Sequence, residues 1–309
     1  MSVLSQPDTL ETDRLIINEV SLRDGLQLEK KILTTDVKWT LFSMLKEAGV
    51  RRLELSSFVS PKAVPQMADA SDLFAKAIDY PEMHSTALVV NHKGYQRAIK
   101  SGAKAIAAVL IPSDTLSIKN SRLTTDQALD FIKHLLEHAQ RDRIWTRVYL
   151  SVAWVCPFEG AIPPARIIRM AEHVHEWGAN EIALADTIGH AHPLEVGSLC
   201  SEVGKSIGID KVAVHLHDTL ALGLANAAAA IAAGVRIIDT SFGGLGGCPF
   251  APGSRGNLAT EDLLLMADKM GLPTGISIEK IDQITRYIQT HLGRPIGGRT
   301  QAWWREHHA

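Results

Sequence analysis

Short runs rich in β-branched and other apolar residues alternate along the chain with longer stretches whose apolar residues recur every three or four positions. The short runs are predicted strands and the longer stretches predicted amphipathic helices, because these two periods place apolar side chains on one face of each element. Eight strands are predicted: Arg14–Val20, Arg52–Ser56, Ser85–Val90, Ala105–Ile111, Arg147–Ala153, Glu181–Ala185, Val212–His217 and Arg236–Thr240. The helices predicted between them include Asp36–Ala48, Gln127–Gln140, Pro164–Trp177 and Leu220–Ala233.

The order of these elements predicts the fold class. Strands that alternate with helices favour a parallel sheet, and eight repeats without a long linker favour closure into a (β/α)₈ TIM barrel. Glycine follows several of the helices, at Gly49, Gly178 and Gly234, where it supplies the left-handed residue that ends a helix. An open doubly wound sheet is the alternative, and it is disfavoured because no Gly-x-Gly-x-x-Gly turn follows the first strand.

A single barrel accounts for the length of 309 residues. We divide the chain into an N-terminal extension (1–13), a barrel domain (14–292) and a polar C-terminal tail (293–309). Within the domain, Asn257–Met270 and Ile278–Leu292 are predicted helices that follow the eighth strand and close the barrel. The tail is expected to be partly disordered because it is polar.

Composition narrows the classes of partner. Hydrophobic residues make up 46% and charged residues 21%, and the formal net charge is −2 without a run of like charges, which argues against nucleic acid as a partner. No stretch of 18 uncharged apolar residues predicts a membrane span. The acidic residues Asp8, Glu11 and Asp13 make the start unlike a signal or transit peptide, so a cytoplasmic protein is expected.

Polar residues collect where the predicted strands end, and such ends meet at one mouth of a TIM barrel. His215 and His217 lie two apart on the seventh strand and so face the same side, and Asp24 follows the first strand. Two imidazoles and a carboxylate at one mouth make a plausible divalent-metal site. Taken singly, the histidines could be structural, and Arg23-Asp24 could be a surface ion pair in a turn.

The three cysteines, Cys156, Cys200 and Cys248, are odd in number and far apart, so no disulfide framework is expected. Cys248 lies in a glycine-rich segment after the eighth strand, which has no Gly-Lys-Ser/Thr and is therefore not a P-loop. A buried apolar role is open to Cys248, but a flexible segment at the catalytic face favours a reactive thiol.

Taken together, these segments resemble the 3-hydroxy-3-methylglutaryl-CoA (HMG-CoA) lyases, within a wider group of metal-dependent barrels that carry an Asp-Arg-Glu or Arg-Asp signature. The resemblance covers about Leu15 to Gly271. Its most specific parts are Arg23-Asp24-Gly25-Leu26-Gln27, Ser57-Phe58-Val59-Ser60-Pro61-Lys62, Val64-Pro65-Gln66-Met67, Cys156-Pro157-Phe158-Glu159-Gly160, Asp186-Thr187-Ile188-Gly189, His215-Leu216-His217-Asp218-Thr219, Gly246-Gly247-Cys248-Pro249 and Gly256-Asn257-Leu258-Ala259-Thr260-Glu261-Asp262.

The resemblance implies a metal cofactor, Mg²⁺ or Mn²⁺, bound by Asp24, His215, His217 and Asn257. It also implies a reverse Claisen cleavage of HMG-CoA to acetyl-CoA and acetoacetate. Oxygen donors suit these hard ions, although the two imidazoles leave Zn²⁺ chemically open. A homodimer is expected from the same resemblance.

Catalytic and substrate-binding roles follow from the resemblance in the same way. Arg23 would stabilise the thioester enolate and Cys248 would protonate it, while Glu54, Asp24 and His215 would relay protons, the initial base being left open. The residues expected to bind or position the acyl-CoA substrate are Gln27, Lys30, Asp186 and Thr187, with Lys30 meeting the CoA phosphates.

Departures from the family pattern bear on the acyl group. Ser21-Leu22 stands where Gly-Pro is usual, Leu55-Ser56 replaces a Thr pair, Trp154-Val155 replaces a smaller pair, and His190-Ala191-His192 follows the Asp186 motif. Citramalyl-CoA or a longer 3-hydroxy-3-alkylglutaryl-CoA is therefore an alternative substrate.

Three rival functions are weighed against the lyase. A condensing enzyme that joins an acyl-CoA to a 2-oxo acid, similar to isopropylmalate synthases, usually carries a C-terminal regulatory region, and here the chain ends soon after the predicted barrel. A zinc hydrolase commonly carries His-x-His on its first strand, whereas here the pair is on the seventh. A non-catalytic barrel predicts that changing Cys248 costs no activity.

Overall fold

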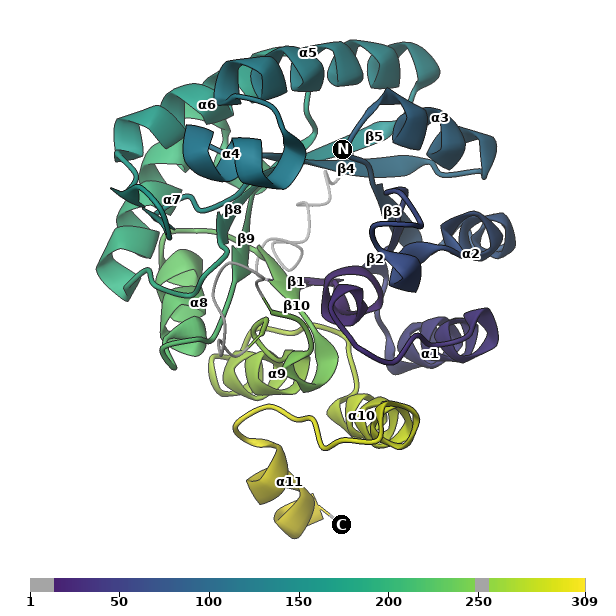
Figure 1. Ribbon diagram of the computed structural model, residues 1–309. Helices are drawn as coiled ribbons and strands as arrows, with labels where there is room; N and C mark the ends of the chain where they lie inside the picture. Colours follow the sequence, from purple (N-terminus) through teal and green to yellow (C-terminus); the bar gives the residue numbers. More distant parts are fainter. Residues whose placement is uncertain (1–13, 248–255, 309) are drawn as a thin grey trace, which may run out of the picture.

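The computed structural model describes residues 14–247 and 256–308, and they form a closed barrel of eight parallel strands surrounded by helices (Figure 1). The predicted (β/α)₈ TIM barrel is confirmed. Neighbouring strands follow the order β1-β10-β9-β8-β5-β4-β3-β2 around the barrel. The barrel strands are β1 (Ile16–Glu19), β2 (Arg52–Ser57), β3 (His84–Leu88), β4 (Ala105–Leu110), β5 (Trp145–Leu150), β8 (Glu181–Asp186), β9 (Val212–Leu216) and β10 (Ile237–Thr240).

Helices cover the outside of the barrel, and the two after α9 extend beyond the ring at one edge (Figure 1). No helix within 14–247 and 256–308 is long and apolar enough to cross a membrane. The α-helices are α1 (Thr35–Ala48), α2 (Ala70–Ala77), α3 (His92–Lys100), α4 (Asp114–Ser121), α5 (Thr125–Asp142), α6 (Pro164–Glu176), α7 (Pro193–Ile207), α8 (Gly223–Ala232), α9 (Thr260–Lys269), α10 (Ile278–Leu292) and α11 (Gln301–His308). Four short helical turns accompany them, η1 (Ser21–Gly25), η2 (Pro65–Met67), η3 (Ile209–Lys211) and η4 (Phe242–Gly244).

Helix α1 illustrates how the sequence sets the element boundaries. The Thr34 side chain accepts a hydrogen bond from the backbone N–H of Val37 and caps the helix N-terminus. Gly49 ends the helix in the left-handed conformation, with φ of 101°. A Cβ atom there would lie 2.1 Å from the carbonyl oxygen of Gly275, so only glycine fits both the dihedral angle and the space.

The interior of the barrel differs from the apolar layer between the strands and the helices. Most buried apolar side chains lie in that outer layer, whereas only a small apolar cluster, which includes Tyr149 and Ile237, faces the barrel axis. Beside this cluster the strands bury charged side chains, among them Arg147, Glu181 and Asp239. TIM barrels usually fill this space with branched apolar residues. The inner charges therefore need a separate explanation.

Glu19, the last residue of β1, ties the first strand to the segments that follow the last strand. One carboxylate oxygen accepts the backbone N–H groups of Ser21 and Phe242, at 3.2 and 3.1 Å, and the other accepts the Thr260 hydroxyl at 2.6 Å. Because burial disfavours the charged form more strongly than these hydrogen bonds favour it, the pKa of Glu19 rises to about 7.

Two local elements differ from the sequence predictions. Residues Val155–Cys156 (β6) and Gly160–Ala161 (β7) form an antiparallel pair that the apolar pattern was too short to predict. The tail was expected to be partly disordered, but Gln301–His308 forms helix α11. Buried Asp282 on α10 accepts hydrogen bonds from Gln301 and Arg305, which explains why this polar segment is ordered.

We predict that Glu19 makes stability depend on pH. Its folded pKa of about 7 exceeds the ordinary value of 4.5, so its stabilising contribution is complete below about pH 4.5 and is lost as pH rises through 7. Unfolding in urea at several pH values should show the wild type losing up to about 3 kcal/mol relative to Glu19→Gln between pH 5 and pH 8. A difference between the two proteins that stays constant over this range would contradict the assignment.

Candidate active site

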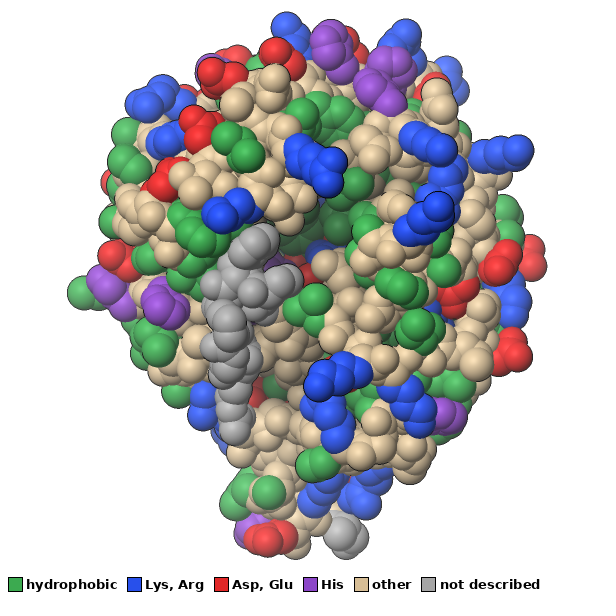
Figure 2. Space-filling view, in the orientation of Figure 1, with side chains coloured by type: hydrophobic (Ala, Val, Ile, Leu, Met, Phe, Trp, Pro, Cys, Tyr) green, Lys and Arg blue, Asp and Glu red, His purple; other side chains and the backbone are tan. Residues whose placement is uncertain are grey.

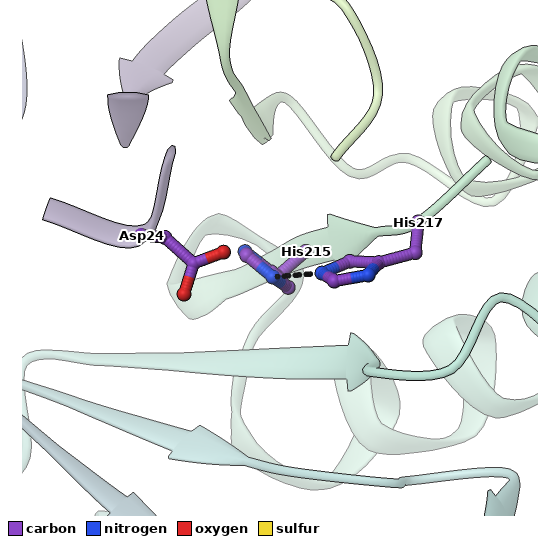
Figure 3. A group of neighbouring side chains, drawn as sticks. All are labelled: Asp24, His215 and His217. Carbon is purple, nitrogen blue, oxygen red and sulfur yellow. Dashed lines mark hydrogen bonds between the residues drawn. The ribbon is translucent and has the colours of Figure 1, made fainter. Parts of the chain in front are cut away.

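Three side chains from distant parts of the chain meet at one end of the barrel. Asp24 lies in η1, directly after β1; His215 lies on β9 and His217 just beyond it (Figure 3). Their ligand atoms all lie within 4.8 Å of one another, and this is the one group of described residues that could hold a metal ion. The meeting of Asp24, His215 and His217 predicted from the strand ends is confirmed.

The turn that carries Asp24 is a five-residue π-helix rather than an ordinary turn. The backbone N–H groups of Asp24 and Gly25 both donate to the carbonyl of Val20, at 2.8 and 3.2 Å. A Cβ atom on Gly25 would lie 2.9 Å from the Ser241 hydroxyl oxygen, so glycine allows the turn to pack against the segment after β10. Single π-turns are frequent at functional sites.

The histidine pair fits a cation in spacing and in protonation. The Nε2 atoms of His215 and His217 are 3.1 Å apart. Ligands at adjacent positions of an octahedral ion, each about 2.1 Å from it, lie about 3.0 Å apart. Burial, together with the charge of His215, lowers the pKa of His217 to about 3, so its ring is neutral and can ligate a metal. Its Nδ1 atom is buried without a hydrogen-bond partner among the described residues.

Asn257 reaches the same place from the far side of the glycine-rich segment. Residues 256–258 run beside the end of β9, where Asp218 donates its backbone N–H to Gly256 and Leu258 donates to Leu216. The Asn257 amide donates to Asp24 at 2.8 Å and to the Leu245 carbonyl at 2.9 Å. The predicted fourth ligand therefore lies in contact with Asp24.

Arg23 lies between two carboxylates in the same mouth. Its guanidinium approaches Glu54 at 2.5 Å and pairs with Asp24. Burial would lower the pKa of Arg23, but these carboxylates raise it, so the group stays charged. Burial would likewise raise the pKa of Asp24, but Arg23 and the two imidazoles hold that pKa below its usual value. Asp24 is therefore a carboxylate at neutral pH.

Glu54, predicted to take part in the proton relay, lies within β2. It is the third of six residues, and the register between β2 and β3 shifts directly after it. One carboxylate oxygen binds Arg23, while the other is buried without a hydrogen-bond partner among the described residues. That second oxygen is free to accept a proton or a hydrogen bond.

A network behind His215 was missed by the sequence analysis. The carboxylate of Asp239 lies 3.1 Å from Nδ1 of His215, and it also accepts hydrogen bonds from Arg147, Tyr149 and Asn18. Burial alone would raise the pKa of Asp239, but the Arg147 guanidinium holds it far below its usual range. The sequence does contain a signal for this network, because the charged residues Arg147 and Asp239 stand within otherwise apolar strands.

The predicted substrate-binding residues are not brought together by contacts with one another. Lys30 is exposed and Gln27 half-buried on the segment after η1. The Asp186 carboxylate accepts the backbone N–H groups of His190 and Ala191, and burial raises its pKa to about 6. Thr187 binds Ser151 and accepts the N–H of Val152, a residue in the left-handed region with φ of 48°. These last two side chains shape the loops after β8 and β5.

The C-terminal tail also borders the site, through carboxylates in the first turn of α9. Asp262 accepts the backbone N–H groups of Arg299 and Thr300, and Glu261 accepts those of Gly298 and Gly243. Beneath this part of the tail is a cavity of about 590 Å³, whose lining includes Asn257, Gly246, Asp218, Arg294, Arg299 and Arg305. Gly297 also donates its backbone N–H to the Gly243 carbonyl at 3.1 Å, so the tail helps to hold the first end of the glycine-rich segment.

Cys248 lies outside the described residues, between the two ends of that segment. A Cβ atom on Gly256 would lie 2.4 Å from the carbonyl oxygen of Gly246, so glycine is needed where the two ends touch. The face of the molecule is hollowed at this point, and acidic and histidine side chains are visible in its depth (Figure 2). The barrel and this hollow define a TIM-barrel enzyme with a candidate cation site at its mouth.

Comparison with known proteins identifies the group. A family model described as HMGL-like matches residues 14–288. The hydroxymethylglutaryl-CoA lyase of Bacillus subtilis is 37% identical over 93% of this chain and 96% of its own length, and the mitochondrial enzyme of Bos taurus is 40% identical over 90% and 86%. The chain belongs to the HMGL-like family, whose members are metal-dependent, and it is an enzyme of the lyase type.

Solved structures agree with this assignment. The HMG-CoA lyase from Bacillus subtilis superposes with a TM-score of 0.90 at 36% identity, over 95% of this chain and 98% of that chain. An HMG-CoA lyase from Acinetobacter baumannii, solved in complex with coenzyme A and 3-methylmalate, also superposes with a TM-score of 0.90 at 36% identity. The superposition covers 95% of this chain and 96% of that chain. The barrel described above is therefore the barrel of these lyases.

We predict that Mn²⁺ binding depends on His217. Replacing its imidazole in His217→Gln removes one of the two imidazole nitrogen ligands, so Mn²⁺ affinity measured by isothermal titration calorimetry should fall at least about tenfold. The matched control is His84→Gln, because His84 belongs to β3 and is not a member of the cluster. Equal affinity in both variants would show that Mn²⁺ binds elsewhere.

Proposed function

We propose that this chain uses Mg²⁺ or Mn²⁺ to cleave 3-hydroxy-3-methylglutaryl-CoA into acetyl-CoA and acetoacetate. The observation that carries the proposal is the meeting of Asp24, His215 and His217 at the barrel mouth, with the guanidinium of Arg23 beside them. The curated relatives at 37–40% identity are named hydroxymethylglutaryl-CoA lyases, which supports this substrate over the other acyl-CoA esters.

The ligands that we propose for the cation are Asp24, His215, His217 and Asn257. A carboxylate, an amide oxygen and two neutral imidazoles suit Mg²⁺ or Mn²⁺ when substrate oxygens complete the shell. The cation, chelated by the 3-hydroxyl and the carboxylate of the substrate, would lower the pKa of that hydroxyl. Asn257 would turn its amide oxygen toward the cation, since its nitrogen already donates to Asp24.

The bond changes follow a reverse Claisen reaction. The 3-hydroxyl loses its proton, the new carbonyl forms at C3, and the electrons of the C2–C3 bond move to the thioester as an enolate. Arg23 is charged and buried beside Asp24, so it can stabilise that developing negative charge without reorganisation. Cys248 would then give a proton to C2, which completes acetyl-CoA.

Two carboxylates compete for the role of base. Asp24 has a lowered pKa and donors on both sides, which suits a ligand better than a base. Glu54 has one buried oxygen without a partner among the described residues, within the ion pair that it makes with Arg23. We therefore propose Glu54 as the group that receives the hydroxyl proton, with His215 and Asp24 fixing the position of the substrate.

Substrate contacts beyond the reacting atoms remain proposals. Lys30 is exposed near the mouth and would meet the CoA phosphates, and Gln27 would position the acyl group. For Asp186 and Thr187 we propose an indirect part, because their polar atoms already hold the loops after β8 and β5. We also propose a homodimer, as expected from the resemblance to these lyases, and a cytoplasmic location.

The proposed function predicts both the substrate and the direction of the reaction. With Mg²⁺ or Mn²⁺, a panel containing HMG-CoA, citramalyl-CoA and longer 3-hydroxy-3-alkylglutaryl-CoA esters should give the fastest turnover with HMG-CoA. Mass spectrometry should identify acetyl-CoA and acetoacetate. If another ester is cleaved faster, HMG-CoA is not the preferred substrate. If free thiol is released from acetyl-CoA in the presence of a 2-oxo acid, the protein is a condensing enzyme instead.

A second prediction concerns Arg23. Because Arg23→Gln removes a preorganised positive charge, kcat for HMG-CoA should fall at least about a hundredfold while Mn²⁺ affinity changes only a few-fold. Arg286→Gln is the control, since it removes an arginine–carboxylate pair on α10. Unchanged turnover in Arg23→Gln would contradict the proposed role, and kinetics at saturating Mn²⁺ decide between the outcomes.

A further inference from the structure

Asp239 on β10 is completely enclosed by hydrogen-bond donors. One carboxylate oxygen accepts from Arg147 at 2.6 Å and from Asn18 at 3.0 Å. The other accepts from the Tyr149 hydroxyl at 2.9 Å and lies 3.1 Å from Nδ1 of His215. The residue is 1% exposed, so water does not compete for these contacts. Every neighbour that the carboxylate meets is a donor, and its acceptor capacity is fully used.

This environment decides which nitrogen of His215 carries the proton. A carboxylate can only accept, so Nδ1 of His215 must be the N–H that faces Asp239. In the neutral ring Nε2 then keeps its lone pair, and Nε2 is the atom that faces His217 in the mouth. The hydrogen bond to Asp239 therefore fixes both the tautomer and the orientation of the His215 ring.

We propose that Asp239 is a positioning residue that sets His215 for cation binding, and that Arg147 and Tyr149 hold Asp239 in place. This inference rests on the cation site of the proposed function. Metal-ligating histidines commonly donate their second nitrogen to such a carboxylate, and loss of that partner weakens metal binding about 10- to 100-fold.

The arrangement behind Asp239 explains why the barrel interior is charged. Arg147 also lies 3.2 Å from Glu181, and one guanidinium nitrogen of Arg52 donates to both carboxylate oxygens of Glu181 at 2.9 Å. This row, which we call the inner charge row (Arg52, Glu181, Arg147 and Asp239), runs along the inside of the barrel to His215. Buried ion pairs add little stability over apolar packing of the same shape. The part of the row next to His215 therefore has a role that packing alone would not require.

The Tyr149 ring adds a second constraint on the same imidazole. It meets the His215 ring edge-on, with centroids 5.7 Å apart. The Arg147 guanidinium lies over the Tyr149 ring at 4.6 Å from its centroid. Tyr149 thus contacts His215 through its ring and Asp239 through its hydroxyl, and it can be changed to Phe without removing the ring contact.

Two variants test the proposal through Mn²⁺ affinity, measured by calorimetry or electron paramagnetic resonance without substrate. In Asp239→Asn an amide presents N–H groups where only donors approach, so His215 loses its fixed tautomer and Mn²⁺ should bind about 10- to 100-fold more weakly. In Tyr149→Phe the fold keeps its packing and loses one donor, so affinity should fall by a smaller factor of about two to five. This second variant keeps the test valid if Asp239→Asn does not fold.

The matched control is Arg52→Gln, which breaks the inner charge row at its far end. It should lower the melting temperature while Mn²⁺ affinity stays within about twofold, because His215 keeps its partner. Wild-type affinity in both Asp239→Asn and Tyr149→Phe, with weak binding in His217→Gln, would overturn this inference and leave the proposed function intact. Equal loss in Arg52→Gln would overturn it too, by showing a merely structural effect. Absence of Mn²⁺ binding in the wild type would overturn both.

Discussion

Two imidazole nitrogens, those of His215 and His217, face each other at 3.1 Å in a buried position beside a carboxylate. Lone pairs do not approach each other so closely without a proton or a cation to share. A hydrogen bond from the Nε2–H of one neutral ring to the other accounts for this distance without a cation, and the low pKa of His217 keeps its ring neutral and able to ligate one. In the proposed site a divalent cation would be bound by the two nitrogens and by Asp24 at the same time. The remaining features of the barrel mouth follow from holding these atoms together.

Several parts of the structure hold the side chains of this site close together. Asp24 is held by the π-turn after β1, and Asn257 by the pairing of residues 256–258 with the end of β9. Glu19 joins the end of β1 to Phe242 and Thr260, on either side of the glycine-rich segment, and Gly297 of the tail donates to the Gly243 carbonyl. The backbone around the site is thus held from several directions.

The sequence allowed the fold and the centre of the site to be predicted for definite physical reasons. The barrel could be predicted from the periodicity of the strands, from the helix stops at Gly49 and Gly234, and from the eight strand–helix repeats. The two-residue spacing of His215 and His217 was enough to place both imidazoles on one side. Asp239 was not predicted, because its role depends on β5 and β10 facing each other across the barrel interior, which no local pattern encodes. The ordered tail was missed for a similar reason: its partners, Asp262 and Asp282, lie on other helices.

The central claim is that Asp24, His215, His217 and Asn257 surround one divalent cation. Diffraction from crystals grown with Mn²⁺, recorded for the anomalous signal of manganese, tests it most directly. The account predicts one strong anomalous peak at coordination distance, about 2.1 Å, from a carboxylate oxygen of Asp24 and from Nε2 of both histidines. A peak elsewhere, or no peak here at saturating Mn²⁺, would contradict the account.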